Sequence, residues 1–222
     1  MTLNEIIELV QQHHPNMGYK EIRLALNRAQ NDYCARTELI KTVYNQTSVA
    51  GRRYYELDDN ILKITSVQIN DVTIPRLQGN PIIDDDEYDG EDGLGAGTSS
   101  SNDRYWYIVD NKLAIVEKIL RTLTRDDKTS NFQSISEAKE IRLNTISQGS
   151  DFTSNLNDVS ELPAQFHEGL SYKVIADGYL VGNVNIDAHK IFYAKYKDSV
   201  KEGRKYARSN YTQTGNIRQT HF

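Results

Sequence analysis

The class of fold follows from the stretch GRRYYELDDNILKITSVQIN, residues 51–70, because the spacing of apolar side chains changes within it. In residues 61–69 the side chains alternate with a period of about two, which is typical of a β-strand. One face is expected to carry Ile61, Lys63, Thr65, Val67 and Ile69. The other face is expected to carry Leu62, Ile64, Ser66 and Gln68. The following IND and VTI, residues 69–74, predict a tight turn and a second, antiparallel strand.

Helical patterns precede this stretch. Thr2 and Glu5 have the spacing of a capping box, in which each side chain accepts the other residue's backbone N–H, so a short helix is expected over 2–14. A second helix is predicted from about Gly18 to Asn45, with the helical region closing at Gly51. Its apolar stripe consists of Ile22, Leu26, Ala29, Tyr33, Ile40 and Val43.

Strand patterns continue to residue 146, and helical patterns return after it. Residues 104–118 predict two strands about the turn Asp110–Asn111, and residues 136–146 can form another. The segments 78–103 and 124–160 are rich in Ser, Asn, Asp and Gly, so they are predicted to be flexible loops. From Leu162 a helix is expected, with Ser160 as its N-cap and Pro163 in its first turn. A last helix is predicted over 185–211, with one side formed by Ile186, Tyr193, Tyr196 and Val200.

These elements predict an α+β fold. Segments 1–50 and 160–210 are expected to form a helical bundle, because helices at both ends of the chain can come together. Segment 51–159 is then a central, antiparallel β-rich insertion with long acidic and polar loops. Residues 211–222 are polar and lack periodicity, so they are expected to form an extended C-terminal arm.

Composition limits the class of protein. Apolar residues make up 38% of the 222 residues, which favours an elongated or partner-dependent core. No apolar run approaches the roughly 18 residues needed to cross a bilayer. The first residues have no basic region or small-residue cleavage site, so a soluble, intracellular chain without a signal peptide is expected. Cys34 is the only cysteine, which excludes an intramolecular disulfide and predicts a small buried side chain.

Charge is spread unevenly along the chain. The net charge is −5, yet from His189 onward eight Lys or Arg residues stand against two acids. A basic C-terminal region in an acidic chain indicates docking against an acidic partner. A solvated helix end with a frayed tail explains the same charges equally well.

Motifs that could bind metals or nucleotides do not meet the requirements of those sites. In DDDEYDGED, residues 84–92, aligning Gly90 with the glycine of a calcium loop places Ala96 where a bidentate Glu is needed. A mobile acidic surface loop is therefore favoured, and a weak, non-specific cation site stays open. GLGAGTSS, residues 93–100, has no phosphate-binding lysine. His167 and Glu168 begin a zinc motif, but Ser171 occupies the position of its second histidine.

No catalytic constellation or cofactor motif is apparent in the sequence, so we predict neither an enzyme nor a bound cofactor or metal. Tyrosine occurs 14 times, and RRYYEL, DRYWYIV and KIFYAKYK interleave aromatic with basic residues. Such segments fit nucleic-acid stacking, and they also fit half-buried strands and subunit interfaces. The net acidity favours the interface interpretation, because DNA affinity depends first on positive charge.

Two stretches together resemble a known family. RRYYELDDNILKITSVQINDVTI, residues 52–74, is similar to the strand pair of phage head–tail connector proteins, also called adaptor proteins. ELPAQFHEGLSYKVIADGYLVG, residues 161–182, resembles the helix that follows their β region. The opening helix and the tyrosine-rich last helix occur in matching order, although Asp58 stands where these proteins more often have proline.

The resemblance implies a structural virion protein, assembled in the host cytoplasm. Adaptors form a ring of about twelve copies under the portal of a short-tailed phage, extend the DNA channel and carry the next tail component. The implied partners are other copies, the portal protein and downstream tail or nozzle proteins. DNA would pass through the channel without specific binding, and no membrane is involved.

The resemblance also implies two contact regions. The portal-docking arm would comprise Arg204, Lys205, Arg208, Tyr211, Ile217, Arg218 and Phe222. The tail-facing part of the β insertion would comprise Arg52, Arg53, Tyr54, Tyr55, Tyr105, Trp106 and Tyr107. Two alternatives remain: another tail ring or head-completion protein, or a sequence-independent DNA-binding protein, which predicts a steep salt dependence of binding.

Overall fold

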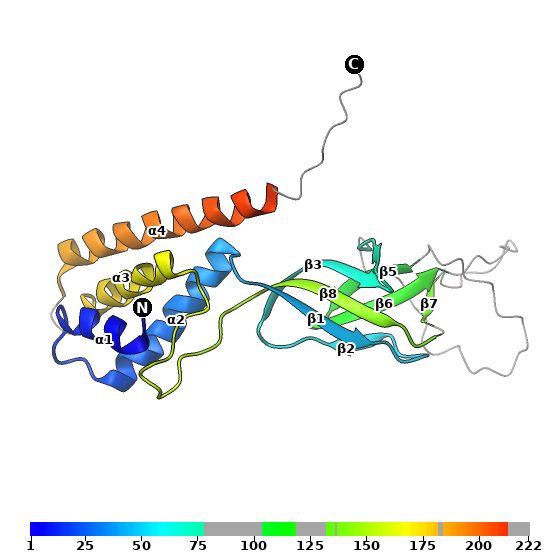
Figure 1. The fold of residues 1–222 in the computed structure, drawn as a ribbon, viewed down its shortest axis with the longest axis horizontal. Helices are drawn as coiled ribbons and strands as arrows, with labels where there is room; N and C mark the ends of the chain where they lie inside the picture. Colours follow the sequence, from blue (N-terminus) through cyan, green and yellow to red (C-terminus); the bar gives the residue numbers. More distant parts are fainter. Residues whose placement is uncertain (78–103, 119–131, 136, 182–183, 213–222) are drawn as a thin grey trace, which may run out of the picture. The chain divides into compact units, whose positions relative to one another are not determined.

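The fold is given by a computed structural model that describes residues 1–77, 104–118, 132–135, 137–181 and 184–212 (Figure 1). It combines helices with two antiparallel sheets, so the predicted α+β class is confirmed. The chain divides into two compact units. The helical unit comprises Met1–Lys41 and Ile146–Phe222, and the β unit comprises Thr42–Thr145. The chain therefore changes unit at other positions than the expected 50/51 and 159/160.

The helical unit contains the helices α1 (Leu3–Gln11), α2 (Tyr19–Thr37), α3 (His167–Gly178) and α4 (Ile186–Thr212), and the short 3-10 helix η1 (Ala164–Phe166). The predicted capping box begins α1: the backbone N–H of Glu5 donates to Thr2 Oγ1 at 3.3 Å, and that of Thr2 donates to Glu5 Oε2 at 2.9 Å. The last helix lies where the sequence places it, extended to Thr212.

Two predicted helix boundaries are wrong. Helix α2 ends at Thr37 rather than at Asn45, because Glu38 adopts a left-handed backbone with φ of 55° and its N–H donates to Cys34 O. The strand β1 (Lys41–Thr47) follows instead. Ser160 does not cap a helix. Its hydroxyl donates to the buried Gln30 side chain, and helical structure begins only after Pro163.

Helix α3 packs against each of the other three helices, so it forms the centre of the helical unit. The core contains Tyr33, Leu170 and Tyr196, whose side chains are almost completely buried. Cys34 lies in this core, as expected, and burial raises the pKa of its thiol.

Helix α4 approaches α2 and α3 closely at two glycines. An added Cβ on Gly203 would lie 2.8 Å from Tyr33 Oη and 2.9 Å from Thr37 Cγ2, closer than carbon atoms normally come to such neighbours. At Gly169 on α3 the added atom would collide with the side chain of Ser199 on α4. These glycines allow the helix backbones to come together at positions where a side chain would separate them.

We expect Gly203→Ala to lower the free energy of unfolding by about 1–3 kcal/mol, because overpacking against Tyr33 and Thr37 outweighs the better helix propensity of alanine. Urea unfolding followed by circular dichroism measures this change. Gly18→Ser is the matched control: at this N-cap of α2 an added Cβ meets no atom within 4 Å, so no loss is expected. Unchanged stability in Gly203→Ala would show that the close approach is unimportant.

The β unit contains two sheets. In the first, the strand order is β1–β8–β3–β4, with β3 (Ile61–Ile69), β4 (Val72–Ile74) and β8 (Glu140–Ser147). In the second, β2 (Tyr54–Glu56), β5 (Arg104–Val109) and β7 (Phe132–Ser134) each pair with β6 (Lys112–Lys118). The stretch 51–70 thus supplies strands to both sheets: β2 to one and β3 to the other.

Both predicted hairpins are confirmed. Asn70 and Asp71 join β3 to β4, Asp110 and Asn111 join β5 to β6, and all four residues have φ between 46° and 63°. Two consecutive residues with positive φ define the turn that matches the twist of a hairpin, and Asn and Asp tolerate this conformation. Local turn chemistry therefore fixes both registers.

The prediction of one long loop over 124–160 is wrong, because β7 and β8 lie within this range. The strand predicted at 136–146 is confirmed as β8, shifted slightly toward the C-terminus. The other predicted loop, 78–103, lies outside the described residues, and with it lie the acidic segment 84–92 and the glycine-rich segment 93–100.

The predicted faces of β3 are wrong in part. Ile64, Val67 and Ile69 are all buried in one core, although the strict alternation places Ile64 on the opposite face. Only residues 67–69 of β3 pair with β4, while Thr65 Oγ1 donates to Asn144 O on β8. Strand β4 therefore flanks only the end of β3, while β8 also lies beside that end, where the Asn70 N–H donates to Glu140 O. Strict alternation does not hold along the whole strand. This core draws residues from both sheets, including Tyr55, Trp106 and Leu143.

Candidate interaction surfaces

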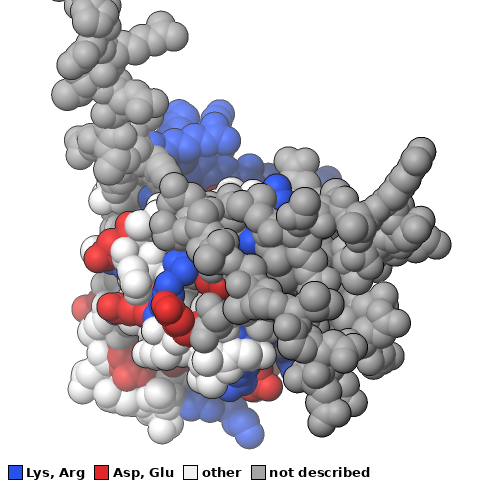
Figure 2. Space-filling view, turned by 90° about the vertical axis from the view of Figure 1, so that its right-hand side faces the viewer, with Lys and Arg blue, Asp and Glu red and all other residues white. Residues whose placement is uncertain are grey.

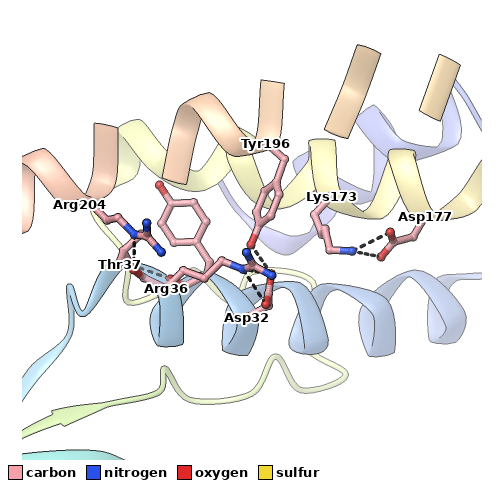
Figure 3. Close-up of polar contacts among 8 residues, drawn as sticks. Asp32, Arg36, Thr37, Lys173, Asp177, Tyr196 and Arg204 are labelled. Carbon is pink, nitrogen blue, oxygen red and sulfur yellow. Dashed lines mark hydrogen bonds and ion pairs between the residues drawn. The ribbon is translucent and has the colours of Figure 1, made fainter. Parts of the chain in front are cut away.

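A polar seam holds α4 against α2 (Figure 3). Tyr196 Oη donates to Asp32 Oδ2 at 2.6 Å, and Arg36 Nε donates to both carboxylate oxygens of Asp32 at 2.9 Å. Burial alone would raise the pKa of Asp32, but the hydrogen bonds from Tyr196 and Arg36 outweigh it and lower the pKa. Asp32 therefore stays ionised and connects the two helices.

The seam continues toward the C-terminal half of α4. Tyr33 Oη donates to the backbone oxygen of Ser199 at 2.9 Å, and burial raises the pKa of Tyr33 to about 12. Arg204 Nε donates to the backbone oxygen of Arg36 at 2.8 Å (Figure 3). Because Arg36 O lies in the last turn of α2, a cation at this position also interacts favourably with the helix dipole. The seam fixes α4 along much of its length and leaves its opposite side open to solvent.

The aromatic and basic residues of KIFYAKYK, residues 190–197, are divided between packing and surface. Phe192 and Tyr193 are half-buried between α4 and its neighbours. Lys195 Nζ lies 5.1 Å from the centre of the Tyr172 ring, and Lys197 Nζ lies 4.7 Å from that of Tyr193. These cation–π contacts cover the rings with exposed charge, so the interleaving arises from packing between α3 and α4.

The predicted portal-docking arm begins on a helix. Arg204, Lys205 and Arg208 lie on the last turns of α4 with exposed side chains, and the backbone of Tyr211 is also helical. Ile217, Arg218 and Phe222 lie outside the described residues. The helix therefore brings three of the predicted bases together, and the expected start of the arm at residue 211 is too early.

The predicted tail-facing set contains both core and surface residues. Tyr55, Trp106 and Tyr107 are at most 4% exposed, so they serve packing within the β unit. The hydroxyl of Tyr55 donates to the backbone oxygen of Arg52 at 2.9 Å. Arg52 is exposed. The residues of this set that reach the surface, at least in part, are Arg52, Arg53, Tyr54 and Tyr105.

A cavity of about 770 Å³, not expected from the sequence, opens beside the turn between α1 and α2. The residues Leu24, Tyr179 and Val181 line it, together with His13 and His14 just beyond α1. Both histidines point toward the end of α3: His13 Nδ1 lies 3.2 Å from Tyr179 Oη, and His14 Nε2 lies 2.9 Å from Ile175 O. Because the walls come from segments far apart in the sequence, periodicity could not reveal this cavity.

Among the described residues, no three His, Cys, Asp or Glu side chains gather as ligands of a metal ion. None of the helices in those parts of the chain combines the length and apolarity needed to cross a bilayer. On the described surface that Figure 2 shows, acidic and basic side chains lie among one another. Mixed charge of this kind suits contact with proteins better than contact with phosphates.

The described part of the chain combines an α-helical unit with a β unit. The chain belongs to the SU10 adaptor protein family, whose model matches residues 1–218. This match confirms the resemblance to phage adaptor proteins and extends it over nearly the whole chain. Membership implies a structural component of the phage particle that associates with other virion proteins, rather than an enzyme. A search among curated proteins found no match to this chain.

Proposed function

We propose that the protein forms a head–tail adaptor ring that docks under the portal, extends the DNA channel and provides the platform for tail attachment. The observation that carries this proposal is the family match over residues 1–218. The division into two compact units supports a division of labour. The helical unit would contact the portal and neighbouring copies, and the β unit would contact downstream tail or nozzle proteins.

Helix α4 provides the route to the portal. Its 27 residues span about 40 Å at the usual rise of a helix, and its last turns carry Arg204, Lys205 and Arg208. The segment after Thr212 contains Ile217, Arg218 and Phe222. A polar segment with a few apolar and basic side chains can fold on a partner, using backbone hydrogen bonds, arginine pairing and an aromatic anchor.

The β unit provides the surface for the tail. Arg53 lies with its guanidinium 6.0 Å from the centre of the Tyr54 ring, and Arg52 and Tyr105 also reach the surface. Tyrosine and arginine dominate the energetics of many protein interfaces, because they bury a large area and keep a polar group available. These four residues are the tail-facing contacts that we propose.

Ring assembly would multiply weak contacts. About twelve copies, each with a modest affinity for the portal and for its neighbours, can form a stable particle together. DNA would pass through the ring without specific binding, and the protein would reach the virion after assembly in the host cytoplasm.

The proposal predicts that the purified chain alone sediments as a monomer and joins the portal of the same genome in a fixed ring stoichiometry. Deleting residues 213–222, which follow the end of α4, should abolish this joining and leave the thermal unfolding of the chain unchanged. Sedimentation mass and circular dichroism measure the two effects. Normal portal binding by the shortened chain would remove the segment from the mechanism.

Indifference of the complete chain to the portal would contradict the proposed docking. The salt dependence of binding to naked DNA then separates the remaining functions. A lower tail ring would bind DNA weakly at any salt concentration. A sequence-independent DNA-binding protein would lose affinity steeply as salt increases, because each phosphate contact releases counterions.

A further inference from the structure

Two segments of the chain contain no Lys or Arg at all: residues 1–19 and residues 143–172. The fold places them side by side. The backbone N–H of Leu3 donates to Asp158 O at 2.7 Å, and that of Asn4 donates to Leu156 O at 3.0 Å. Thr2 and Val159 also form an isolated antiparallel bridge. Acidic side chains from both segments therefore share one region of the helical unit.

We define the acidic face as Glu5, Glu8, Asp151, Asp158 and Glu161. All five side chains reach the surface, at least in part. Their hydrogen bonds come from neutral donors: the Asn4 amide donates to Glu8, the Ser150 hydroxyl to Glu161, and the Thr153 hydroxyl to Asp158. The bonds from Thr153 also lower the pKa of Asp158. Within the described residues no Lys or Arg forms an ion pair with these carboxylates.

A basic face lies on the C-terminal half of α4. We define it as Lys201, Arg204, Lys205 and Arg208, all of which are exposed. Asp198 and Glu202 are the acids of this half, so positive charge predominates. Arg204 is anchored through Nε to the end of α2, which holds the helix and its charges in place.

The two faces lie on different elements of the helical unit: the acidic face on α1 and the segment before η1, and the basic face on α4. Helix α4 packs on α2 and α3, and α1 also packs on α2 and α3. In Figure 1, α4 and the segment that precedes η1 lie on opposite sides of α3. A single chain thus carries a predominantly positive face and a separate negative face.

We propose that the basic face of α4 in one copy packs against the acidic face of the next copy. The proposal rests on the proposed function, because it names the contact that would build the ring. Such a contact joins two different surfaces, and repeated head-to-tail contacts close into a ring when the rotation between copies allows it. A symmetric dimer through either face would instead bring like charges together, which opposes association.

Apolar side chains support the same pairing. Leu156 and Val159 are 44% and 56% exposed beside the acidic face. On α4, Ile191 and Tyr206 are 58% and 38% exposed. Contact between copies would remove these side chains from water, while the charges around them fix the register. The portal would then be contacted through the segment after Thr212, and Arg204, Lys205 and Arg208 would contact the neighbouring copy.

A charge-swap experiment tests this contact on the portal ring. One variant carries Lys201→Glu and Lys205→Glu, and the other carries Glu8→Lys and Asp151→Lys. Each alone should need at least about a tenfold higher concentration than the wild type to fill the portal, because like charges then face each other between copies. An equimolar mixture of the two should assemble as the wild type does, since every contact in an alternating ring again joins opposite charges.

Whether the mixture of the two variants assembles distinguishes the possible outcomes. If Lys201 and Lys205 contacted the portal instead, mixing would not restore assembly, and the inference would be wrong. It would also be wrong if each variant alone assembled like the wild type, while the proposed function would stand. Failure of the wild type to join the portal would contradict the proposed function itself. The control is the variant Lys112→Glu with Arg142→Glu on the β unit. It changes the charge of the chain as much as Lys201→Glu with Lys205→Glu does, and it should assemble normally.

Discussion

Tyr196→Ala is expected to lower the free energy of unfolding by about 3–5 kcal/mol. Tyr196 is 1% exposed, its ring packs near that of Tyr33, and its hydroxyl donates to Asp32 at 2.6 Å. Truncation removes a large buried ring from the interface of α4 with α2 and leaves a cavity there. It also removes the hydrogen bond that the ionised carboxylate of Asp32 accepts. Urea unfolding followed by far-ultraviolet circular dichroism, which reports the helices, measures the loss.

Tyr196→Phe separates the two contributions. It keeps the ring and removes the hydroxyl, so we expect a loss of about 1–3 kcal/mol, typical of a hydrogen bond to a charged group. If Tyr196→Phe were as destabilising as Tyr196→Ala, the polar seam rather than the packing would hold α4. If neither variant lost stability, α4 would not depend on this position.

The seam also predicts a dependence of stability on pH. The folded protein lowers the pKa of Asp32 below its unfolded value of about 3.9, so the ionised form is favoured in the fold. The contribution of ionised Asp32 to the free energy of unfolding is fully present above the unfolded pKa. It is lost as pH falls through the lower, folded pKa. The difference in stability between the wild type and Tyr196→Phe should therefore shrink below about pH 4.

Features fixed by local chemistry could be predicted from the sequence. The pairs Asn70–Asp71 and Asp110–Asn111 favour positive φ in any context, so both hairpins follow from short stretches alone. The capping box of Thr2 and Glu5 is similarly local. Such signals depend on the backbone within a few residues, and tertiary contacts rarely override them.

The end of α2 could not be predicted in this way. Ile40 and Val43 continue the helical spacing, yet they lie after the left-handed Glu38. Ile40 packs on the helical core and Val43 is exposed on β1. Two apolar residues three positions apart fit either a helix or a strand with an exposed edge, so only the tertiary structure decides between them.

The candidate surfaces were harder to predict from the sequence than the end of α2. Interleaved Arg and aromatic residues indicated an exposed contact region, but Arg52 lies over the ring of Tyr55 and Arg76 over that of Trp106. Stacking inside the folded chain satisfies the same pattern, so the pattern alone cannot separate core from surface. The acidic face is the opposite case, in which a clear sequence pattern does not reveal which segments meet in the fold. The absence of Lys and Arg from residues 1–19 and 143–172 is visible in the sequence, but their adjacency arises from the fold.

Arg104→Met is expected to lower the stability of the β unit by about 3–5 kcal/mol. Arg104 and Glu117 lie directly opposite each other on β5 and β6, and Arg104 Nε donates to Glu117 Oε1 at 2.7 Å. Their side chains are only 10% and 2% exposed. Removing the guanidinium leaves a buried carboxylate without this partner, and the cost of keeping that charge away from water is then no longer offset.

The double variant Arg104→Met with Glu117→Leu tests this explanation, because it removes both charges and keeps apolar volume. We expect it to recover most of the loss and to unfold within about 1–2 kcal/mol of the wild type. Trp106, the only tryptophan, lies in the β unit, so its fluorescence reports this unit during urea unfolding. A double variant as unstable as Arg104→Met would mean that the two side chains stabilise β5 and β6 through their shape. The packing of the two side chains, rather than the attraction between their charges, would then account for the stabilisation.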